Sequence, residues 1–401
     1  MRPHTEAPWV RHLMTASGCA GLGVAVHLAG PFLPVLLTTA GLGAGLIGAS
    51  FLLAWAADAG EAVFSGGLVL AAVALVGVLP ELTIEVHFAF IQRADLVTAN
   101  LTGATRLLLT GAIALPLLVA FNAQRRGHTP PPAVRVAGHR RLELGILLVT
   151  AVFAVQIIVR GSLSVLDGVV LLGLYVWYAR RVQGSPDEEP AVAGVPAGLL
   201  SLPPSYRRPA VAALIIGAAL VVVTIASPFT HALLLTGSSI GVDPYVMIQL
   251  VVPVATEAPE VIVVAVLVAN RRPAQGLALF LASSVSQWTL GLGSLPIAYL
   301  AGGGGFSLPL AGREQLELAL TGAVTLFVVA ALATLRPARV DALLAAGVYA
   351  AEVVWPTTPV RFAGTFVLAV FALNLLLARR RRLRGLLRAA FGRAHAAPPA
   401  G

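Results

Sequence analysis

Long apolar runs alternate with short polar connections along almost the whole chain. A membrane-spanning helix needs roughly 17 to 25 predominantly apolar residues, and twelve runs reach or approach that length. The runs cover residues 12–38, 41–57, 62–92, 95–121, 142–159, 164–179, 210–236, 244–270, 275–300, 316–335, 340–355 and 361–378. They predict an all-α polytopic membrane protein with about 10–12 transmembrane helices.

A segment rich in proline and serine separates six of these runs from the other six. Its acidic triplet, Asp187 to Glu189, is expected to be solvated charge in a flexible connection. The division predicts a fused duplication joined by a loop. The expected parts are an N-terminal extra helix (1–40), a first repeat (41–182), a cytoplasmic linker (183–208), a second repeat (209–355), and a last helix with a basic cytoplasmic tail (356–401).

Composition agrees with a membrane protein. Hydrophobic residues make up 58% of the chain and charged residues 11%, with a mean hydropathy of +0.88. A soluble globule of this length needs far more polar surface. The lipid bilayer is therefore the expected surrounding.

The net charge of +9 indicates how the chain is oriented in the membrane. It does not indicate nucleic-acid binding, because the arginines lie at the ends of the runs without interleaved aromatic residues. Arginine clusters occur at 125–141, 180–181, 207–208, 271–272, 336–339 and 379–388. If the runs alternate, every cluster falls on one side, which predicts that both termini are cytoplasmic. Lone arginines at 93, 160, 313 and 361 fall on the other side. The absence of lysine and the abundance of alanine, glycine and arginine are typical of a GC-rich bacterium, so we expect the bacterial inner membrane.

Enzyme chemistry finds little support. The single cysteine, Cys19, excludes an internal disulfide and a cysteine-built metal site. The chain has no His-Glu-x-x-His pair and no Gly-x-Ser-x-Gly elbow. We therefore expect a protein that is not an enzyme and that holds no cofactor.

The most informative polar positions are two Pro-Glu dipeptides, Pro80-Glu81 and Pro259-Glu260, each inside an apolar run. A carboxylate at membrane depth is unfavourable, so it usually faces a protein interior and serves an ion or proton path. A proline before it breaks the helix and frees a backbone carbonyl. By the arginine bias, the two runs cross the membrane in opposite directions. The pattern predicts two inverted repeats whose broken helices meet near the midplane, as in many secondary transporters.

Two segments resemble a known family. Val76 to Leu82 (VGVLPEL) and Ala255 to Val261 (ATEAPEV) resemble the alpha-repeats of the cation/calcium exchanger superfamily, which includes sodium/calcium and calcium/proton exchangers. Downstream, Asn100 to Gly103 (NLTG) is similar to the Asn-x-x-Gly of the first repeat. Ser283 to Gln287 (SSVSQ) is similar to a segment of the calcium/proton branch.

The resemblance implies a site with one glutamate from each repeat and neutral oxygens around them. By matching position, Glu81 and Glu260 would be the central ligands. Thr256, Ser283 and Gln287 would add neutral oxygens. Calcium takes six to eight oxygen ligands, so this set suits it. The same carboxylates could carry protons on the return half-cycle.

The first repeat departs from this pattern, because Ala104 and Leu108 stand where the second repeat has Ser283 and Gln287. The chain instead offers two further carboxylates, which are candidates for proton coupling. Glu85 lies four residues after Glu81, and Glu257 lies three residues before Glu260.

Three more polar residues are expected to modulate the site, namely Arg106, Asn100 and Thr102. Arg106 lies too deep in its run to reach the membrane surface, so it needs a carboxylate partner such as Glu85. It would either form a structural ion pair or compete with a cation for the glutamates.

The sequence thus predicts a secondary-active cation antiporter that exchanges calcium, or a similar cation, for protons or sodium by alternating access. Its partners would be small inorganic cations, and nucleic acid is not expected. One alternative is a monovalent sodium/proton or potassium/proton antiporter. An alternative of another class is a degenerate, non-transporting membrane sensor or scaffold.

Overall fold

A computed structural model of the chain describes residues 8–64, 76–125, 140–183, 194–269, 272–333 and 339–392. The helices and strand of the first half are α1 (Pro8–Ala29), η1 (Gly30–Phe32), α2 (Val35–Val63), α4 (Leu79–Phe90), α5 (Ala94–Arg125), α6 (Arg141–Arg160), β1 (Ser162–Ser164) and α7 (Val165–Gln183). The second half contains α8 (Val195–Leu200), α9 (Pro204–Ser239), α10 (Pro244–Thr256), α11 (Ala258–Ala269), α12 (Pro273–Ser286), η3 (Gln287–Gly291), α13 (Leu292–Ala301), β2 (Ser307–Pro309), α14 (Gly312–Leu332), α15 (Arg339–Val354), α16 (Thr358–Ala378) and α17 (Arg380–Phe391). The predicted all-helical fold class is confirmed, with two three-residue strands in the described part.

The helices have the dimensions of a multi-pass membrane protein. In the described ranges, six helices are long and apolar enough to cross a bilayer: α1, α2, α6, α9, α14 and α16. The pair α10 and α11, bent by 55°, adds a seventh if it counts as one span. The other predicted runs fall on helices that are shorter, interrupted or more charged. For example, α15 has 16 residues, and α7 carries Asp167, Arg180 and Arg181.

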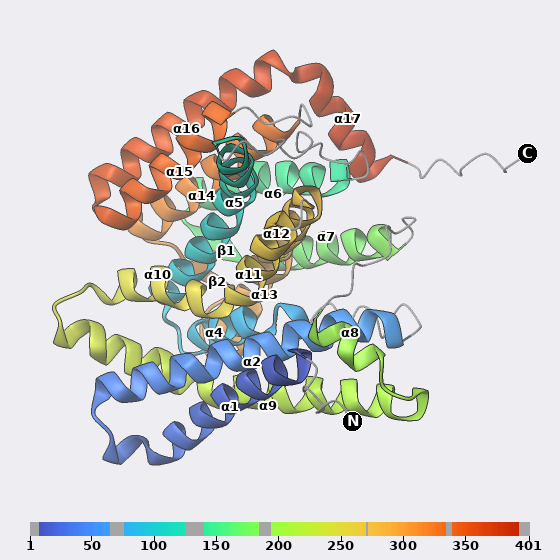
Figure 1. Cartoon of the computed structure of the whole chain (residues 1–401). Coiled ribbons are helices and arrows are strands. Elements are labelled where there is room, and N and C mark those ends of the chain that lie inside the picture. Colours follow the sequence, from blue (N-terminus) through green and yellow to red (C-terminus); the bar gives the residue numbers. More distant parts are fainter. Residues whose placement is uncertain are drawn as a thin grey trace, which may run out of the picture.

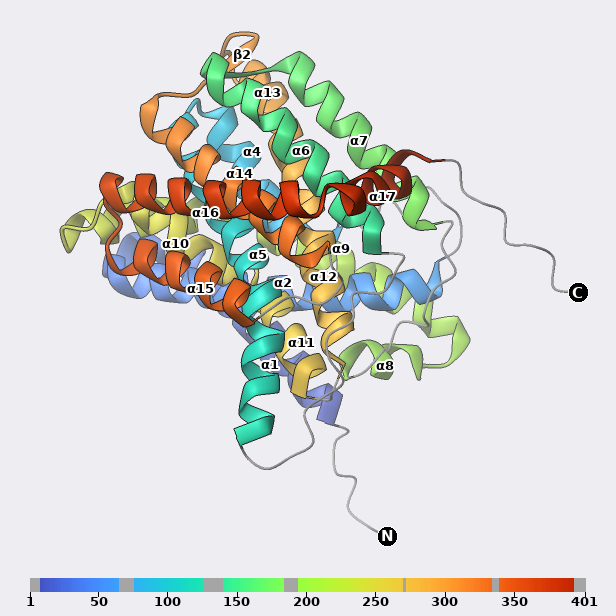
Figure 2. The same cartoon turned by 90° about the horizontal axis from the view of Figure 1, so that it is seen from above.

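The helices form two outer groups with the broken helices between them. In Figure 1, α1, α2 and α9 pack together along the lower side, and α14, α15 and α16 lie along the upper side. Between the groups lie α4, α5, α10, α11, α12 and α13. Seen from above, α16 leads into α17, which packs on α6 (Figure 2). The interrupted helices are thus kept in the interior of the molecule.

Contacts between the halves follow an inverted repeat. Equivalent helices meet each other, α2 against α9 and α6 against α14. Contacts between non-equivalent helices also occur in matched pairs. Helix α7 of the first repeat packs on α13 of the second. Helix α15, the counterpart of α7, packs on α5, the counterpart of α12 and α13. This reciprocal pattern agrees with the predicted pair of inverted repeats.

A two-stranded clip joins the halves at one end. β1 pairs with β2 in antiparallel register, with Leu163 opposite Leu308, and both leucines are 1% exposed. The connection between α6 and α7 is thereby fixed to the connection between α13 and α14.

Three of the four lone arginines, which the sequence places on the side opposite the arginine clusters, form ion pairs with aspartates. Arg93 binds Asp95 and Arg313 binds Asp243, each across 2.8 Å, and Arg160 binds Asp167. The neighbouring carboxylates offset these positive charges, so the arginines are a weak exception to the charge bias. Arg361 behaves differently, because it is buried in the first turn of α16 rather than exposed in a connection.

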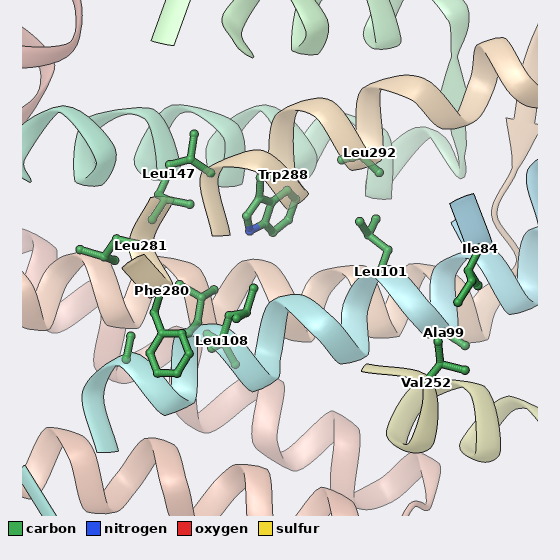
Figure 3. Packing of buried hydrophobic residues seen from close by; sticks show 14 of the residues in the cluster. Ile84, Ala99, Leu101, Leu108, Leu147, Val252, Phe280, Leu281, Trp288 and Leu292 are labelled. Atoms are coloured by element: carbon green, nitrogen blue, oxygen red, sulfur yellow. The ribbon is translucent and has the colours of Figure 1, made fainter. Parts of the chain in front are cut away.

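The interior around α5 is closely packed and apolar. Figure 3 shows side chains from several helices meeting along α5 and η3. They include Ile84, Leu101, Leu108, Leu147, Val252, Phe280, Trp288 and Leu292, each at most 4% exposed. Leu108, which replaces a polar residue of the second repeat, belongs to this apolar packing.

Part of the predicted linker is structured. Its residues 184–193, with the acidic triplet, lie outside the described residues, but α8 follows them. Val195 and Leu199 on α8 are buried against Ala59 of α2 and Val211 of α9. The second half of the linker is therefore docked on the lower helix group.

Candidate functional site

Both Pro-Glu motifs lie where a helix restarts. Glu81 is in the first turn of α4, and Glu260 is in the first turn of α11. The N-terminal end of a helix carries unpaired N–H groups and partial positive charge, which favours an anionic side chain. The inverted repeats thus bring two equivalent half-helix ends, each with a carboxylate, into the interior.

Four side chains form what we call the Pro-Glu layer: Glu81, Thr256, Glu260 and Ser283. The Thr256 side chain neighbours the Glu81 carboxyl, and the Ser283 side chain neighbours the Glu260 carboxyl. The two glutamates are close enough to interact electrostatically. The layer therefore combines one carboxylate and one hydroxyl in the neighbourhood of each half-helix end.

A second set of side chains lies beside the first, and we call it the amide–carboxylate layer: Glu85, Asn100, Glu257 and Gln287. Asn100 Nδ2 donates to Glu85 Oε1 across 3.4 Å, and Gln287 Nε2 donates to Glu257 Oε1 across 3.1 Å. All four residues are at most 4% exposed. Gln287 opens the π-helical turn η3, and such turns are frequent at functional sites.

A small cavity joins the two layers. Its lining includes Glu81, Glu85, Gln287 and Gly291. It therefore lies between α4 and the turn η3, along the face that carries both glutamates of the first repeat.

The four glutamates have no basic partner. In the described part of the chain, no arginine or histidine forms an ion pair with Glu81, Glu85, Glu257 or Glu260. Nor do three or more acidic, histidine or cysteine groups of these residues converge as a preformed metal centre. A cation bound here would draw on hydroxyl, amide and backbone oxygens as well as carboxylates, which is the kind of shell that hard cations accept.

Arg106 lies elsewhere, so the predicted pairing with Glu85 is wrong. Its Nη1 is 2.7 Å from Glu317 Oε2, and its Nε is 3.4 Å from Glu352 Oε2. The expected carboxylate partner exists, but it comes from α14 and α15. Arg106 is therefore held away from the four glutamates.

Arg106 belongs to a buried cluster of polar residues, which we call the arginine cluster: Arg106, Gln249, Glu317, Glu352 and Arg361. Arg361 Nε lies 2.5 Å from Glu317 Oε1. Gln249 accepts from Arg361 across 3.1 Å and donates to Glu317 across 2.8 Å. Two arginines and two glutamates balance in formal charge.

Thr102 touches this cluster rather than the glutamate layers. Its hydroxyl donates to Thr98 O across 2.7 Å and accepts from Gln249 Nε2 across 3.4 Å. Asn100, two residues earlier on α5, instead donates to Glu85. Helix α5 thus contacts the amide–carboxylate layer through Asn100 and the arginine cluster through Thr102.

Close packing of α5 on α10 explains how these groups meet. Pro253 lacks an N–H, so the carbonyl of Gln249 has no helical partner. Gly103 lies against it, and a Cβ there would be 2.0 Å from Gln249 O. Only glycine permits this approach.

Our sequence reasoning missed Glu317, Glu352 and Gln249. Glu317 and Glu352 carried the signal that singled out Glu81, namely a carboxylate within or at the edge of an apolar run. Gln249 offered no comparable signal, because an uncharged amide does not demand the compensation that a charged group needs at membrane depth.

Comparison with known proteins agrees with this geometry. A sequence model of the sodium/calcium exchanger protein family matches residues 13–182 and again residues 210–379. The chain belongs to the sodium/calcium exchanger family. This family consists of membrane transporters of inorganic cations, and each half of the chain matches its model once.

Solved structures of exchangers share the fold. The crystal structure of the H+/Ca2+ exchanger CAX is 29% identical and covers 95% of this chain and 99% of its own, with a TM-score of 0.85. Native YfkE is 14% identical, covering 90% and 99%, with a TM-score of 0.58. The sodium-calcium exchanger NCX_Mj is 17% identical, covering 86% and 99%, with a TM-score of 0.53. No curated protein matches the chain in a sequence search.

Proposed function

We propose that this exchanger-family protein moves calcium, or a similar hard cation, across the bacterial inner membrane in exchange for protons or sodium ions. The observation that carries the proposal is a group of four glutamates without a basic partner, placed at two inverted helix breaks, of which Glu260 is partly exposed and the other three are buried. Buried carboxylates are strongly unfavourable unless they are paired, protonated or bound to a cation. A cation cargo supplies the missing charge.

The donor set favours a hard cation. The Pro-Glu layer offers Glu81 and Glu260 with the hydroxyls of Thr256 and Ser283, all oxygen ligands of the kind that calcium accepts. In this proposal, the amide of Gln287 fixes the neighbouring Glu257. The 29% identical CAX, described as an H+/Ca2+ exchanger, agrees with this cargo and favours protons as the counter-ion.

Alternating access fits the arrangement of the helices. Helices α4 and α11, which carry Glu81 and Glu260, lie between the lower helix group, α1, α2 and α9, and the opposite group built on α14. Movement of one group against the other would expose the glutamates to one side at a time.

The non-transporting alternative loses its main argument. It rested on the two polar positions lost from the first repeat and on Arg106 occupying the glutamates, whereas Arg106 pairs with Glu317 and Glu352. The site residues are therefore left available to a cargo. The monovalent antiporter remains a second candidate because Glu85 adds a carboxylate to the two central ones.

The test is cation flux into proteoliposomes. Calcium uptake is measured under an imposed pH gradient and, separately, under a sodium gradient, for the wild type, Glu81→Gln and Glu260→Gln. Asp95→Asn is the control, because it removes an exposed carboxylate that is paired with Arg93.

Gradient-driven uptake that is lost in both glutamine variants and kept in the control would support the proposal and identify the counter-ion. Calcium uptake that is unchanged in Glu260→Gln would refute it. Sodium or potassium flux without calcium flux would favour the monovalent antiporter.

A further inference from the structure

Helix α17 follows the membrane span α16 directly and carries a high density of positive charge. Residues 379–388 contain six arginines, and no acidic residue follows Glu352 in the chain. Figure 2 shows α16 leading into α17, which contacts the beginning of α6 and the end of α7. The positive charge of α17 therefore lies where α16 is expected to leave the membrane.

This helix is docked on the protein. Leu386 and Ala390 are 1% and 0% exposed, and α17 packs on α6. The contact is close, because a Cβ on Gly145 of α6 would lie 2.6 Å from Leu386 O. On the other side, Trp177 Nε1 of α7 donates to Ala390 O across 2.9 Å. The outer face of α17 is therefore a preformed surface.

That outer face combines arginines with apolar side chains. Arg380, Arg384 and Arg388 follow one another at intervals of four residues and are exposed, so they form a row on one side of the helix, which we call the arginine row. Leu387 and Phe391 each lie three residues after an arginine of this row and are 40% and 48% exposed. Within the described ranges, no carboxylate forms an ion pair with the arginine row.

An aromatic pair extends the apolar edge onto α7. The rings of Phe391 and Trp177 stack with their centroids 6.4 Å apart and their planes at 20°. Trp177 is 41% exposed, and the Arg181 guanidinium lies 5.0 Å from the centre of its ring. Tryptophan beside arginine at the end of a span is typical of the level of the lipid headgroups.

The combination of charge and apolar edge indicates what this surface binds. Arginine binds phosphate oxygens through a planar fork of N–H donors. A helix with arginines on its polar face and leucine or phenylalanine beside them lies between the headgroups and the acyl chains of a membrane. Positive charge that only oriented α16 would need neither the exposed apolar edge nor the docking on α6. The surface thus fits an anionic phospholipid, whose phosphate and acyl chains match both parts.

We propose that the arginine row of α17, together with Leu387, Phe391 and Trp177, is a binding surface for the headgroups of anionic phospholipids. The arginines bind the phosphates, and the apolar edge enters the boundary between headgroups and acyl chains. This interaction goes beyond the proposed exchange function and does not depend on which cation is moved.

The experiment counts the lipids bound to the purified full-length protein in detergent by native mass spectrometry. Phosphatidylglycerol or phosphatidylcholine is added to the wild type and to a double variant, Arg384→Gln with Arg388→Gln. The matched control, Arg208→Gln with Arg272→Gln, removes two exposed arginines outside α17. One arginine near an anionic lipid surface strengthens binding about fivefold, so the double variant should bind phosphatidylglycerol roughly 25-fold more weakly.

The expected result is a preference of the wild type for phosphatidylglycerol that the double variant loses and the control keeps. Three results would overturn the proposal: equal binding of the two lipids by the wild type, an unchanged preference in the double variant, or an equal loss in the control. Inorganic polyphosphate that binds as tightly as phosphatidylglycerol through the same arginines would also overturn it, because the surface would then serve a soluble polyanion. None of these results bears on the exchange function, which rests on other residues.

A variant that keeps every arginine tests the apolar edge in a bilayer. Cys19→Ser is combined with Leu387→Cys, and a fluorophore on the new cysteine is measured in proteoliposomes that contain brominated phosphatidylglycerol or brominated phosphatidylcholine. We expect stronger quenching by the brominated phosphatidylglycerol, and loss of this difference when Arg384→Gln is added. No quenching by either lipid would place residue 387 away from the acyl chains, and equal quenching by both would remove the selectivity, so either result refutes the surface.

Discussion

The Arg106 guanidinium contacts the Glu317 carboxylate across 2.7 Å in the interior of the protein, where their side chains are 3% and 0% exposed. Glu317 also receives Arg361, so one carboxylate joins α5, α14 and α16. Removing one partner of a buried pair leaves an uncompensated charge, which is far more harmful than loss of the pair as a whole. The arginine cluster therefore ties α16 to α5, the helix that carries Asn100 and Thr102.

Glu317→Gln should strongly destabilise the protein, because two buried arginines lose their common counter-charge. The expected loss is about 3–5 kcal/mol, measured as a fall in the thermal unfolding temperature in detergent. The control is Asp95→Asn, which breaks an exposed pair with Arg93 and should change stability by less than about 1 kcal/mol. Equal effects of the two variants would show that the arginine cluster does not stabilise the fold.

Gln287→Leu should impair calcium transport with the protein still folded. Leucine is present at the equivalent position of the first repeat, Leu108, but it cannot donate to Glu257. Loss of the group that orients a ligand typically lowers metal affinity about 10- to 100-fold, so half-maximal uptake should need correspondingly more calcium. Gln156→Leu removes an amide that donates to Asp167 instead of to Glu257, so it should leave uptake unchanged. A wild-type calcium dependence in Gln287→Leu would mean that Gln287 has no part in binding.

Gly103→Ala should separate α5 from α10. The new methyl would meet the Gln249 carbonyl at 2.0 Å, so the helix backbones must move apart. We expect a loss of about 1–3 kcal/mol, typical of overpacking in a core, in thermal unfolding. Gly217→Ala on α9 meets nothing within 4 Å and should be neutral or slightly stabilising. An equal response at both positions would contradict the close approach of α5 and α10.

Thiol labelling should reveal the orientation of the chain. Cys19 is replaced by serine, and a single cysteine is placed either at Gly305, in the connection before β2, or at Arg384 on α17. The arginine bias predicts that a membrane-impermeant maleimide labels Gly305→Cys in intact cells and labels Arg384→Cys only after permeabilisation. The reverse labelling would invert the proposed topology.

The helical fold class and the pairing of the two Pro-Glu motifs could be predicted from sequence, because each rests on a local signal. Apolar length indicates a membrane helix, and a proline before an intramembrane glutamate indicates a break. Opposite orientation followed from the arginines. The structure places Glu81 and Glu260 in equivalent first turns, as that reasoning requires.

The partner of Arg106 could not be predicted in the same way. Its carboxylates come from residues more than two hundred positions away, and only the packing of α5 against α14 and α15 decides which glutamate is near. The burial of Arg361 could not be predicted either, because it depends on where α16 begins and on what packs beside it.

The paired strands β1 and β2 restrict how the molecule can move. Backbone hydrogen bonds from Val165 N to Phe306 O and from Leu310 N to Gly161 O extend the pairing at both ends. Sliding one half past the other along this edge would break them all at once. Tilting about the edge would break none. We therefore expect these two connections to stay together during the proposed exchange cycle, and the movement to be carried by helices that do not contact the clip.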